Sequence, residues 1–393
     1  MAMRIGFLVS HPIQYLTPLF RELDKRCELT VYFAHRQTPQ QQASAGFGVA
    51  FEWDVDLMSG YRSEFLPNVA RHPSSDSFWG CNTPTVSRRI AEGRFDAFIV
   101  PGWALWSYWQ AVFACRRAGV PVLVRGDSQL VTQRRGAMRL AKELVFRQVL
   151  RAFDGFLYVG QRNREYLLHY GVPPERLFFS PHCVDNDAFG RGSAAIREQV
   201  QASASGRMPR VLFVGKLTPR KRPQDVLQAA ILLQQRGLAV EVVFAGSGEL
   251  SEELERLAQS AGLTIRFLGF VNQSELPAIY ASADLLVLSS VSETWGLVVN
   301  EAMACGVPAV VSEVVGCAPD LIERGKSGAT YPPGDIPAMA RAIEEVLRMD
   351  RKVLRQGVAE RIARYSPDVA ATGIVDGVTR LRQRFFAKAG KAA

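Results

Sequence analysis

The chain has 393 residues, of which 48% are hydrophobic and 22% are charged, as in ordinary globular proteins. This length argues against a single hydrophobic core, because such cores stop growing at about 250–300 residues, and it predicts two domains. The formal net charge of +9 favours anionic partners such as nucleotides, anionic lipid surfaces or nucleic acid, and it does not choose among them.

The sequence predicts neither export nor a membrane span. Its first residues lack the basic start and the cleavage site of a signal peptide. The most apolar long stretch, residues 97–115, is interrupted by Pro101, Gly102 and Gln110, and so falls short of the about 18 apolar residues of a span. The six cysteines lack CxxC or zinc-type spacing, so we expect reduced thiols in a cytosolic protein.

The first half of the chain alternates apolar runs of strand length with helical patterns. The predicted strands are residues 4–9, 29–33, 97–100, 122–124 and 155–159. Alternation of this kind specifies a parallel sheet that helices cover on both faces. Residues 35–82 are irregular, and a loop of this length is usually functional or mobile.

The second half repeats the alternation. Its predicted strands are residues 211–214, 240–245, 265–268, 285–288 and 309–311. The predicted fold class is therefore α/β with two doubly wound units. The polar, Gly- and Ser-rich stretch at 186–209 predicts an interdomain linker. We expect a first domain at residues 1–190, a second at 207–366, and a C-terminal helix at 367–388 that packs back on the first.

The most informative motif is LLVLSSVSETWGLVVNEAMACG at residues 285–306, which predicts a buried strand, a sharp turn and a helix. The free N–H groups at the start of such a helix suit phosphate or other electron-rich oxygens. Glu293 in the turn and Glu301 in the helix are separated by an axial rise of about 7–8 Å. A retaining glycosidase has its carboxyl pair at about 5 Å, so these two acids suit the two ends of one nucleotide sugar. The alternative for each is a solvated glutamate.

Three further loops follow predicted strands. The motif VLFVGKLTPRKRP at 211–223 places Gly215, Lys216 and Lys221 before a helix, where cations can neutralise a diphosphate. A solvated basic turn is the alternative. The motifs VVFAGSGEL at 242–250 and IRFLGFVNQSE at 265–275 are weak signals alone. All four loops leave the carboxyl ends of parallel strands, where doubly wound sheets bind ligands.

Together these motifs resemble the donor domain of glycosyltransferase family 4, densely over residues 210–336. The segment GVPPERLFFSPHCVD at 171–185 resembles the family's sequence before that domain. The resemblance implies the GT-B fold, in which two doubly wound Rossmann-like domains face each other across a cleft. It also implies a nucleoside-diphosphate sugar donor, retention at the anomeric carbon, no cofactor and no essential metal.

The resemblance also implies roles for individual residues. Glu293 would hold the hydroxyls of the donor sugar, Glu301 the ribose and Lys221 the diphosphate. The implied donor-binding residues are Gly215, Lys216, Lys221, Gly246, Gly248, Glu249, Phe270, Val271, Glu293, Trp295, Gly296, Leu297, Val298 and Glu301. The catalytic residues we predict are Glu293, Lys221 and Lys216 together with His11, which lies where the chain departs from the family. Lys216 stands where the family usually has Arg, so the positive charge is kept but the two parallel hydrogen bonds of a guanidinium are lost. Trp295 stands where the family usually has Phe or Tyr.

The first domain departs further from the family. Residues 10–15 replace its glycine-rich loop, so His11 directly follows the first strand and could bind the acceptor or a donor phosphate. A capping or core role is the alternative. Arg125 or Asp127 could replace the histidine that many relatives carry after the fourth strand, and Asp127 could equally cap a helix. The acceptor-side residues we predict are His11, Gln14, Trp103, Arg125 and Asp127.

Other features have two interpretations. Trp103, Trp106, Tyr108 and Trp109 could stack on an acceptor sugar, although packing in a core is favoured. The basic stretch at 134–153 could attract anionic lipid, but its apolar residues surround most of the helical wheel and favour a packed helix. The Asp-x-Asp triplets at 54–56 and 185–187 are interpreted as turn or surface residues.

The sequence therefore predicts a retaining glycosyltransferase that acts in cell-envelope, exopolysaccharide or lipid-linked glycan synthesis. The alternatives are glycosylation of a small secondary metabolite, a nucleotide-sugar epimerase of the same fold, and a non-catalytic subunit that binds a sugar nucleotide. We expect a cytoplasmic protein that associates peripherally with the inner face of an anionic membrane. No nucleic-acid partner is expected, because the sequence contains no recognisable module for one.

Overall fold

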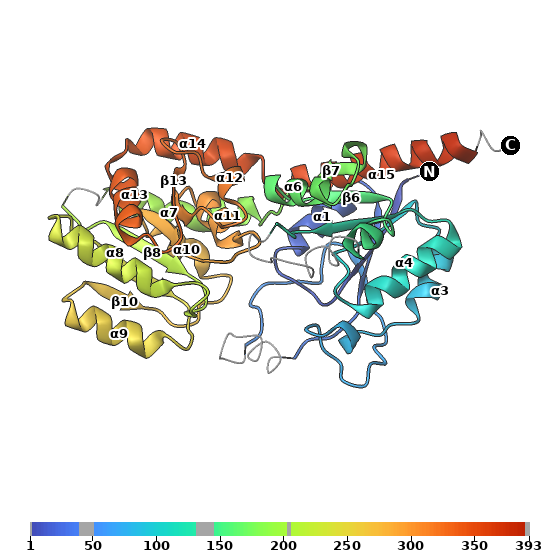
Figure 1. Ribbon diagram of the computed structural model, residues 1–393, viewed down its shortest axis with the longest axis horizontal. Coiled ribbons are helices and arrows are strands. Elements are labelled where there is room, and N and C mark those ends of the chain that lie inside the picture. Colours follow the sequence, from blue (N-terminus) through green and yellow to red (C-terminus); the bar gives the residue numbers. More distant parts are fainter. Residues whose placement is uncertain (1, 39–50, 131–144, 203–205, 390–393) are drawn as a thin grey trace. The chain divides into compact units, whose positions relative to one another are not determined.

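The computed structural model describes residues 2–38, 51–130, 145–202 and 206–389, and the chain forms two compact units (Figure 1). The first unit comprises Met1–Gln37, Asp56–His182 and Pro367–Ala393. The second unit comprises Thr38–Val55 and Cys183–Ser366. A segment from the first half of the sequence therefore belongs to the second unit.

The first unit is built on a seven-stranded parallel sheet with the order β3-β2-β1-β4-β5-β6-β7. Its strands are β1 (Arg4–Val9), β2 (Glu28–Phe33), β3 (Arg62–Phe65), β4 (Ala97–Val100), β5 (Val122–Gly126), β6 (Gly155–Tyr158) and β7 (Leu177–Phe179). Its helical elements are α1 (Thr17–Asp24), η2 (Phe78–Gly80), α3 (Val86–Gly93), α4 (Trp106–Ala118), α6 (Gln161–His169), η3 (Pro174–Arg176) and α15 (Pro367–Ala389). Every residue of the central strand β4 is buried, as expected for a sheet that helices cover on both faces.

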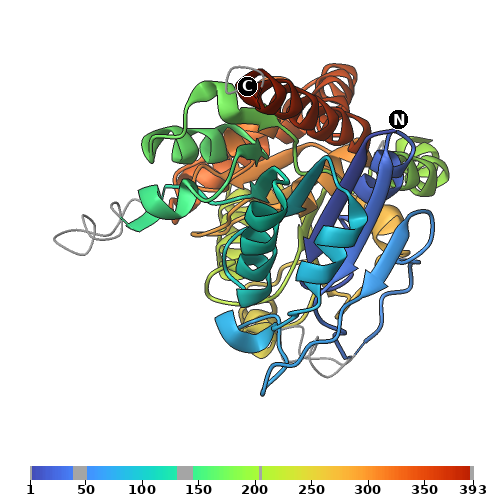
Figure 2. The same ribbon diagram turned by 90° about the vertical axis from the view of Figure 1, so that its right-hand side faces the viewer.

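The C-terminal helix α15, dark red in Figure 2, packs against α1, β6 and β7 of this unit. A glycine makes the close approach possible, since a Cβ at Gly373 would lie 1.7 Å from the backbone oxygen of Phe179. An ion pair joins Arg26 to Asp368 at the start of the helix. The helix is therefore part of the first unit, although it follows the second in the sequence.

The second unit contains a six-stranded parallel sheet with the order β10-β9-β8-β11-β12-β13. Its strands are β8 (Arg210–Val214), β9 (Glu241–Ala245), β10 (Ile265–Phe267), β11 (Leu285–Leu288), β12 (Ala309–Ser312) and β13 (Gly328–Tyr331). Its helices are α7 (Asn186–Ala202), α8 (Pro223–Gln235), α9 (Ser251–Ser260), α10 (Leu276–Ala281), α11 (Leu297–Ala304), α12 (Ala318–Leu321), α13 (Ile336–Arg348) and α14 (Arg351–Ala363). The predicted doubly wound α/β class is confirmed for both units.

The strand order of the second sheet reverses between β8 and β11. The chain runs outward from β8 through β9 to β10, and then from β11 through β12 to β13 on the other side. Doubly wound sheets bind ligands outside the carboxyl ends of the strands at such a switch point. The loops after β8 and β11 are therefore where the fold places a candidate site.

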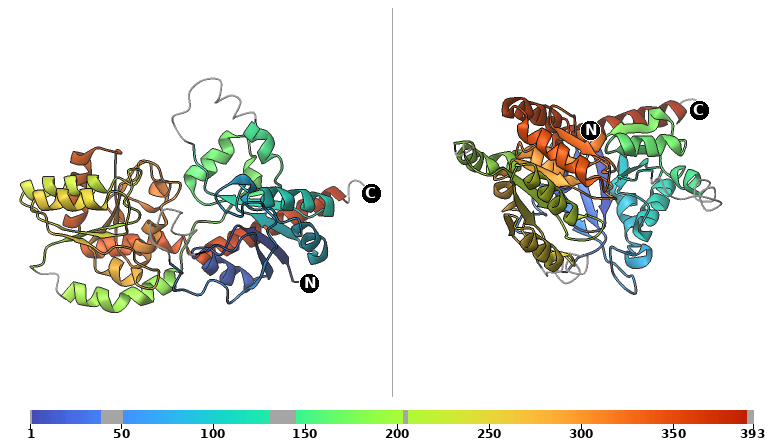
Figure 3. Two further views of the ribbon diagram at one scale, coloured as in Figure 1. Left: turned by 90° about the horizontal axis from the view of Figure 1, so that it is seen from below. Right: turned by 60° about the vertical axis from the view of Figure 1, so that its left-hand side comes forward.

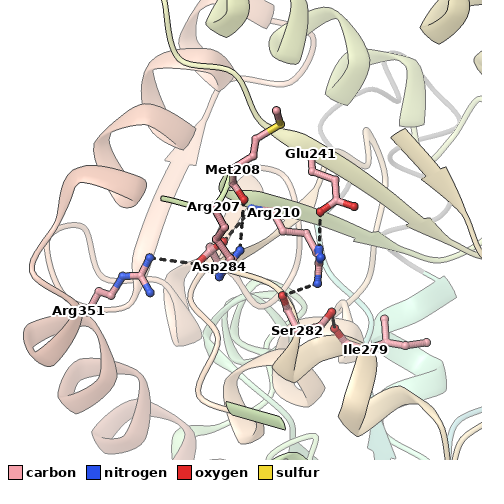
Figure 4. A network of polar contacts seen from close by, with 8 residues as sticks. All are labelled: Arg207, Met208, Arg210, Glu241, Ile279, Ser282, Asp284 and Arg351. Atoms are coloured by element: carbon pink, nitrogen blue, oxygen red, sulfur yellow. Dashed lines mark hydrogen bonds and ion pairs between the residues drawn. The ribbon is translucent and has the colours of Figure 1, made fainter. Parts of the chain in front are cut away.

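The opposite, amino end of this sheet is fixed by Asp284 (Figure 4). Its carboxylate accepts a hydrogen bond of 2.7 Å from the backbone N–H of Arg210. It also forms ion pairs with Arg207 at 2.7 Å and with Arg351 at 3.2 Å. The side chain of Arg210 in turn pairs with Glu241 on β9 at 2.8 Å. These bonds hold the starts of β8, β9 and β11 together.

Every strand predicted from the sequence is present, with ends that differ by one or two residues at most. The strands that sequence analysis missed are β3, β7 and β13, and all three lie at sheet edges. An edge strand is short and need not be apolar on both faces, so it leaves no long hydrophobic run. The strand β3, which reads RSEF, lies within the stretch predicted to be irregular.

The prediction of an interdomain linker at residues 186–209 is wrong, because most of this stretch forms helix α7, light green in Figure 3. This helix packs against α10 and α11, and its Phe189 is buried. Gly192 allows the close contact, since a Cβ there would lie 3.0 Å from Pro277. Gly190, Gly192 and Ser193, which contributed to the linker prediction, thus belong to a packed helix, and the main segment of the second unit begins at Cys183.

Within the described part of the chain, no helix combines the length and the apolar character needed to cross a membrane.

Candidate functional site

The loops that follow β8 and β11 are joined by direct hydrogen bonds. The hydroxyl of Ser289, which is buried, donates to the backbone oxygens of Lys221 at 2.8 Å and of Arg222 at 2.9 Å. The backbone N–H of Val291 donates to the oxygen of Arg220 at 3.0 Å. The two loops at the switch point therefore form one continuous surface.

An ion pair between Lys221 and Glu293 links the same two loops. Both side chains are mostly buried, with 13% and 15% of their surface exposed. Arg220 approaches the same carboxylate at 3.5 Å. Burial lowers the pKa of Lys216, and the nearby charges of Arg220 and Lys221 lower it further. The loop thus holds more positive than negative charge, which suits an anionic ligand.

The turn between β11 and α11 is held by a second segment of backbone. The N–H of Gly316 donates to the oxygen of Glu293 at 3.0 Å, and the N–H of Cys317 donates to the oxygen of Trp295 at 2.9 Å. Gly316 fits because a Cβ there would lie 1.8 Å from the oxygen of Thr294. The turn carrying Glu293 is consequently fixed on both sides.

Helix α11 begins directly after Gly296, whose φ of +102° is a conformation that favours glycine. The N–H groups of Leu297 and Val298 lie in the first helical turn, which has no intrahelical acceptors for them. The start of this helix, next to Glu293, can therefore donate hydrogen bonds to a phosphate or a sugar oxygen.

The Trp295 side chain is directed into the protein. It is 4% exposed, its Nε1 donates to the amide oxygen of Asn300 at 2.8 Å, and its ring lies 5.9 Å from the ring of Tyr365. A donor contact from this residue would have to come from its backbone.

Glu301 is buried on α11 and receives a hydrogen bond from the hydroxyl of Tyr280 at 2.6 Å. Burial raises the pKa of this carboxyl to about 7, although the hydrogen bonds from Tyr280 and Gln273 lower it. A carboxyl with this pKa can change its protonation when a ligand with hydroxyl groups arrives. Sequence analysis did not identify Tyr280 or Gln273 as partners of Glu301, because their positions beside it depend on how the helices and loops pack.

The glycine-containing loops after β8, β9 and β10 are packed tightly on one another. The N–H of Gly215 donates to Ala245 at 2.9 Å, and the N–H of Gly246 donates to Gly269 at 2.7 Å. Gly248 lies against Leu217, where a Cβ would come within 2.4 Å of the backbone oxygen. These glycines bring the backbones of three loops together at one end of the sheet.

The remaining predicted residues of the second unit lie around these loops. Glu249 is exposed after β9, and Phe270 and Val271 are half-buried after β10. The structure thus places all the predicted donor-binding residues at the carboxyl end of the second sheet. Their roles remain predictions.

The acceptor-side residues lie in the first unit. Arg125 at the end of β5 is 5% exposed, and its guanidinium donates to the oxygen of Pro181 at 2.7 Å and to the hydroxyl of Ser180 at 3.2 Å. Asp127 lies 3.8 Å from Nε2 of His182. Arg125 therefore joins β5 to the end of β7, and His182 is a neighbour of Asp127 that sequence analysis did not propose.

His11 follows β1 and its Nδ1 lies 3.0 Å from the hydroxyl of Ser10. Burial, together with the smaller effect of the neighbouring His35, lowers the pKa of His11 to about 4, so the imidazole is neutral near pH 7. Gln14 is half-buried in the same loop. A neutral His11 can accept or donate a hydrogen bond there but carries no charge for a phosphate.

The aromatic cluster divides into a packed and an exposed part. Tyr108 is 5% exposed, and Trp103 packs on the core beside Phe146 and Phe153, as the packing interpretation holds. A row of neighbouring rings continues from Trp106, and within it Phe78, Trp79 and Phe113 are exposed whereas Trp106 and Trp109 are half-buried. Its members are Phe78, Trp79, Trp106, Trp109 and Phe113.

The Asp-x-Asp triplets do not act as pairs. The carboxylate of Asp56 accepts from the N–H groups of Met58 and Ser59, whereas Asp54 contacts Ser274 of the second unit. Asp185 accepts from the N–H of Ala188. Among the described residues, no three or more metal-ligating side chains gather. Residues 134–144 of the basic stretch lie outside the described residues.

Two family descriptions match the chain and together cover both units. Residues 196–364 match "Glycosyl transferases group 1", and residues 12–182 match "Glycosyl transferase 4-like domain". The family predicted from the sequence is thereby confirmed.

Curated relatives share part of the sequence. A D-inositol 3-phosphate glycosyltransferase of Geodermatophilus obscurus is 33% identical over 242 residues, which are 58% of this chain and 53% of the relative. The match thus spans about half of that relative's length. A GDP-mannose-dependent alpha-(1-6)-phosphatidylinositol monomannoside mannosyltransferase of Mycobacterium tuberculosis is 27% identical over 363 residues, 87% of this chain and 89% of the relative.

Solved structures share the fold. Anabaena HepE in complex with UDP has a TM-score of 0.70 at 17% identity, covering 96% of this chain and 100% of that chain. The lipopolysaccharide outer core galactosyltransferase WaaB has a TM-score of 0.66 at 15% identity, with coverage of 96% and 99%. These likenesses confirm the predicted GT-B fold class, with two Rossmann-like α/β domains.

Proposed function

Since the chain belongs to the group 1 glycosyltransferase family, we propose that it transfers a sugar from a nucleoside-diphosphate sugar to an acceptor hydroxyl. The observation that carries this proposal is the Lys221–Glu293 pair beside the start of α11. An ammonium and free N–H groups suit a diphosphate, and a carboxylate suits the hydroxyls of a sugar.

The residues of the second unit would stabilise the departing diphosphate. The bond between the anomeric carbon and the phosphate oxygen breaks, and Lys221, Lys216 and the first-turn N–H groups of α11 stabilise the negative charge that develops. Such preorganised electrostatics is often the largest contribution to catalysis. The acceptor oxygen forms the new bond on the same face, and its proton passes to the leaving phosphate. This route retains configuration and requires neither a metal nor a cofactor.

Substitution of the ion pair tests this proposal. Glu293→Gln and Lys221→Ala should each lower transfer from a cognate donor by about 100-fold or more, as the loss of a transition-state contact does. Glu345→Gln is the control, because Glu345 forms a more exposed pair with Arg324. Transfer near the wild-type rate in both site variants would contradict the assignment. Nucleoside diphosphate released without any acceptor would instead indicate the epimerase-type chemistry.

We propose that the acceptor is a lipid-linked or envelope glycan and that the protein acts at the cytoplasmic face of an anionic membrane. The mycobacterial relative is a phosphatidylinositol monomannoside mannosyltransferase, which supports a lipid acceptor. All six cysteines lie in the described ranges, where they are buried and no disulfide joins them, which suits a reducing compartment. Glycosylation of a small secondary metabolite is the alternative.

The exposed rings of the aromatic row, Phe78, Trp79 and Phe113, support contact with a membrane surface. Trp79 is 67% exposed and lies 5.4 Å from the ring of Trp106, and helix α4 ends with Arg116 and Arg117. Tryptophan favours membrane interfaces, and arginine favours anionic headgroups.

Vesicle binding tests this part of the proposal. The protein should sediment with phosphatidylglycerol vesicles more than with phosphatidylcholine vesicles, and less so as salt increases. Trp79→Ala should weaken this binding. Val69→Ala is the matched control, since Val69 is another apolar residue with 60% exposure. Equal binding by the wild type and Trp79→Ala, or no binding at low salt, would contradict a membrane role for the row.

A further inference from the structure

A segment from the first half of the sequence lies on the loop that follows β10. Phe51 is 9% exposed, and the centroid of its ring lies 4.3 Å from that of Phe270. Trp53 packs edge-on against Phe51, with centroids 4.8 Å apart. Residues 51–54, here called the strap, belong to the second unit although more than 200 positions separate them from this loop.

Hydrogen bonds also join the strap to the loop after β10. The amide of Asn272 donates to the backbone oxygen of Glu52 at 2.8 Å. The backbone N–H of Ser274 donates to the Asp54 carboxylate at 3.1 Å, and the Ser274 hydroxyl donates to its other oxygen. A hydrogen bond to an ionised acceptor is stronger than a neutral one, so Asp54 is the main polar anchor of the strap.

One residue between those that the strap contacts is linked to the candidate site. Gln273 lies between Asn272 and Ser274, and its side chain is hydrogen-bonded to Glu301. The same carboxyl is held by Tyr280 from helix α10, which begins directly after this loop. The strap therefore contacts a loop whose Gln273 is hydrogen-bonded to Glu301.

We propose that the strap is a positioning element for the nucleoside end of the donor. It holds the 270–274 loop in one conformation, so that Gln273 keeps Glu301 aligned for the ribose hydroxyls. Without the strap, the loop would have to become ordered when the donor binds, and that ordering weakens affinity. This inference rests on the proposed function, and it adds residues of the first half of the sequence to the donor site.

Binding of UDP and GDP to the purified full chain, measured by calorimetry without turnover, tests the inference. Asp54→Ala and Phe51→Ala should each weaken the nucleotide that the wild type binds by about tenfold, equivalent to one or two lost contacts. The KM for the donor should rise similarly, whereas kcat and the KM for the acceptor should stay within about twofold. Asp54→Asn keeps an acceptor for Ser274 and should restore most of the affinity.

Asp56→Ala is the matched control. Asp56 lies two positions after Asp54 and has a comparable exposed carboxylate, but its partners are the N–H groups of Met58 and Ser59 and the guanidinium of Arg21, all in the first unit. This variant should bind the nucleotide as the wild type does. Equal weakening by Asp54→Ala and Asp56→Ala would overturn the inference, because it would show a general effect of lost charge.

A double-mutant cycle separates positioning from general stability. If the strap acts through Glu301, Asp54→Ala should have little further effect on nucleotide affinity in a Glu301→Gln background. Additive effects would overturn the inference, as would unchanged affinity in both Asp54→Ala and Phe51→Ala. Failure of the wild type to bind any nucleoside diphosphate would contradict the proposed function itself, which is a different outcome.

Discussion

The ammonium of Lys221 lies against the carboxylate of Glu293, although 72 positions separate the two residues in the sequence. The pair joins the loop after β8 to the loop after β11, at the point where the strand order reverses. The carboxylate of Glu293 is therefore paired with the same ammonium that, under the proposed function, would bind the diphosphate.

This competition predicts opposite effects of the two single substitutions on diphosphate binding. Lys221→Ala should weaken UDP or GDP binding by about 10–100-fold, the range of one charge-assisted hydrogen bond. Glu293→Gln should bind the same nucleotide as tightly as the wild type or up to about tenfold more tightly, since Lys221 is released from its partner. Isothermal titration calorimetry measures both.

The sugar nucleotide distinguishes the two roles further. Glu293→Gln should lose affinity for a donor that carries its sugar, relative to the diphosphate alone, because the carboxylate no longer accepts bonds from sugar hydroxyls. If both variants lose diphosphate affinity to the same extent, the pair is a structural unit and Glu293 does not compete with phosphate.

Glu301 predicts a pH dependence of donor binding. Its pKa is raised to about 7 by burial, so the carboxyl is largely protonated at pH 6 and largely ionised at pH 8. The ionised form can accept bonds from two ribose hydroxyls, so affinity should increase by about three- to tenfold over this interval and binding should release a proton. The nucleotide's own phosphate titrates in the same way with Glu301→Gln, so the difference between the two proteins isolates the effect of Glu301. An identical pH profile for both proteins would contradict a role of the Glu301 carboxylate in donor binding.

The same pKa predicts an effect on folding. An acid whose pKa is higher in the folded state than in the unfolded state stabilises the fold less as pH rises between the two values. The contribution of Glu301 should therefore decrease from about pH 4.5 to about pH 7. Glu301→Gln should remove this decrease, which urea unfolding at several pH values can measure. A wild-type profile unchanged by the substitution would show that another group titrates.

Two glycines with nearly the same backbone conformation differ in their surroundings. Gly215 has a φ of +142° and Gly246 a φ of +144°. A Cβ at Gly246 would lie 2.0 Å from the oxygen of Gly215, whereas no described atom lies within 4 Å of a Cβ at Gly215. Gly215→Ala should cost about 1–3 kcal/mol through backbone strain alone. Gly246→Ala should cost a further 1–3 kcal/mol, roughly, through overpacking. Equal losses on chemical denaturation would show that the loops can separate.

The sequence predicted the central strands and the loops after them because both have local signals. A strand such as β11, buried on both faces, reads as the uninterrupted apolar run LLVL. Close backbone contacts require glycine, so Gly246 and Gly296 marked tight turns. The donor-side loops could be grouped because parallel strands deliver their carboxyl ends to one edge.

The contacts that complete the site had no such signal. Tyr280 reaches Glu301 across 21 positions, and Asp54 reaches Ser274 across 220. Nothing in the residue types distinguishes these pairs from a core tyrosine or a surface aspartate, because the pairing depends on how whole elements pack. For the same reason, the polar helix α7 resembled a linker until its contacts with α10 and α11 were known.

Substitution of Asp284 should lower the stability of the fold but leave donor binding intact. Its side chain is 7% exposed and has three partners at the amino end of the second sheet, opposite the site. Asp284→Ala would leave the guanidinium of Arg207 and the N–H of Arg210 without this acceptor, so the free energy of unfolding should fall by about 3–5 kcal/mol.

Arg351→Ala is the control, since this side chain is 52% exposed and its loss should cost less than about 1 kcal/mol. Guanidinium denaturation measures both, and nucleotide affinity in the folded variants should match the wild type. A similar loss from both substitutions would show that the network depends on Arg351, whereas a loss of affinity in Asp284→Ala would show that the two ends of the sheet are coupled.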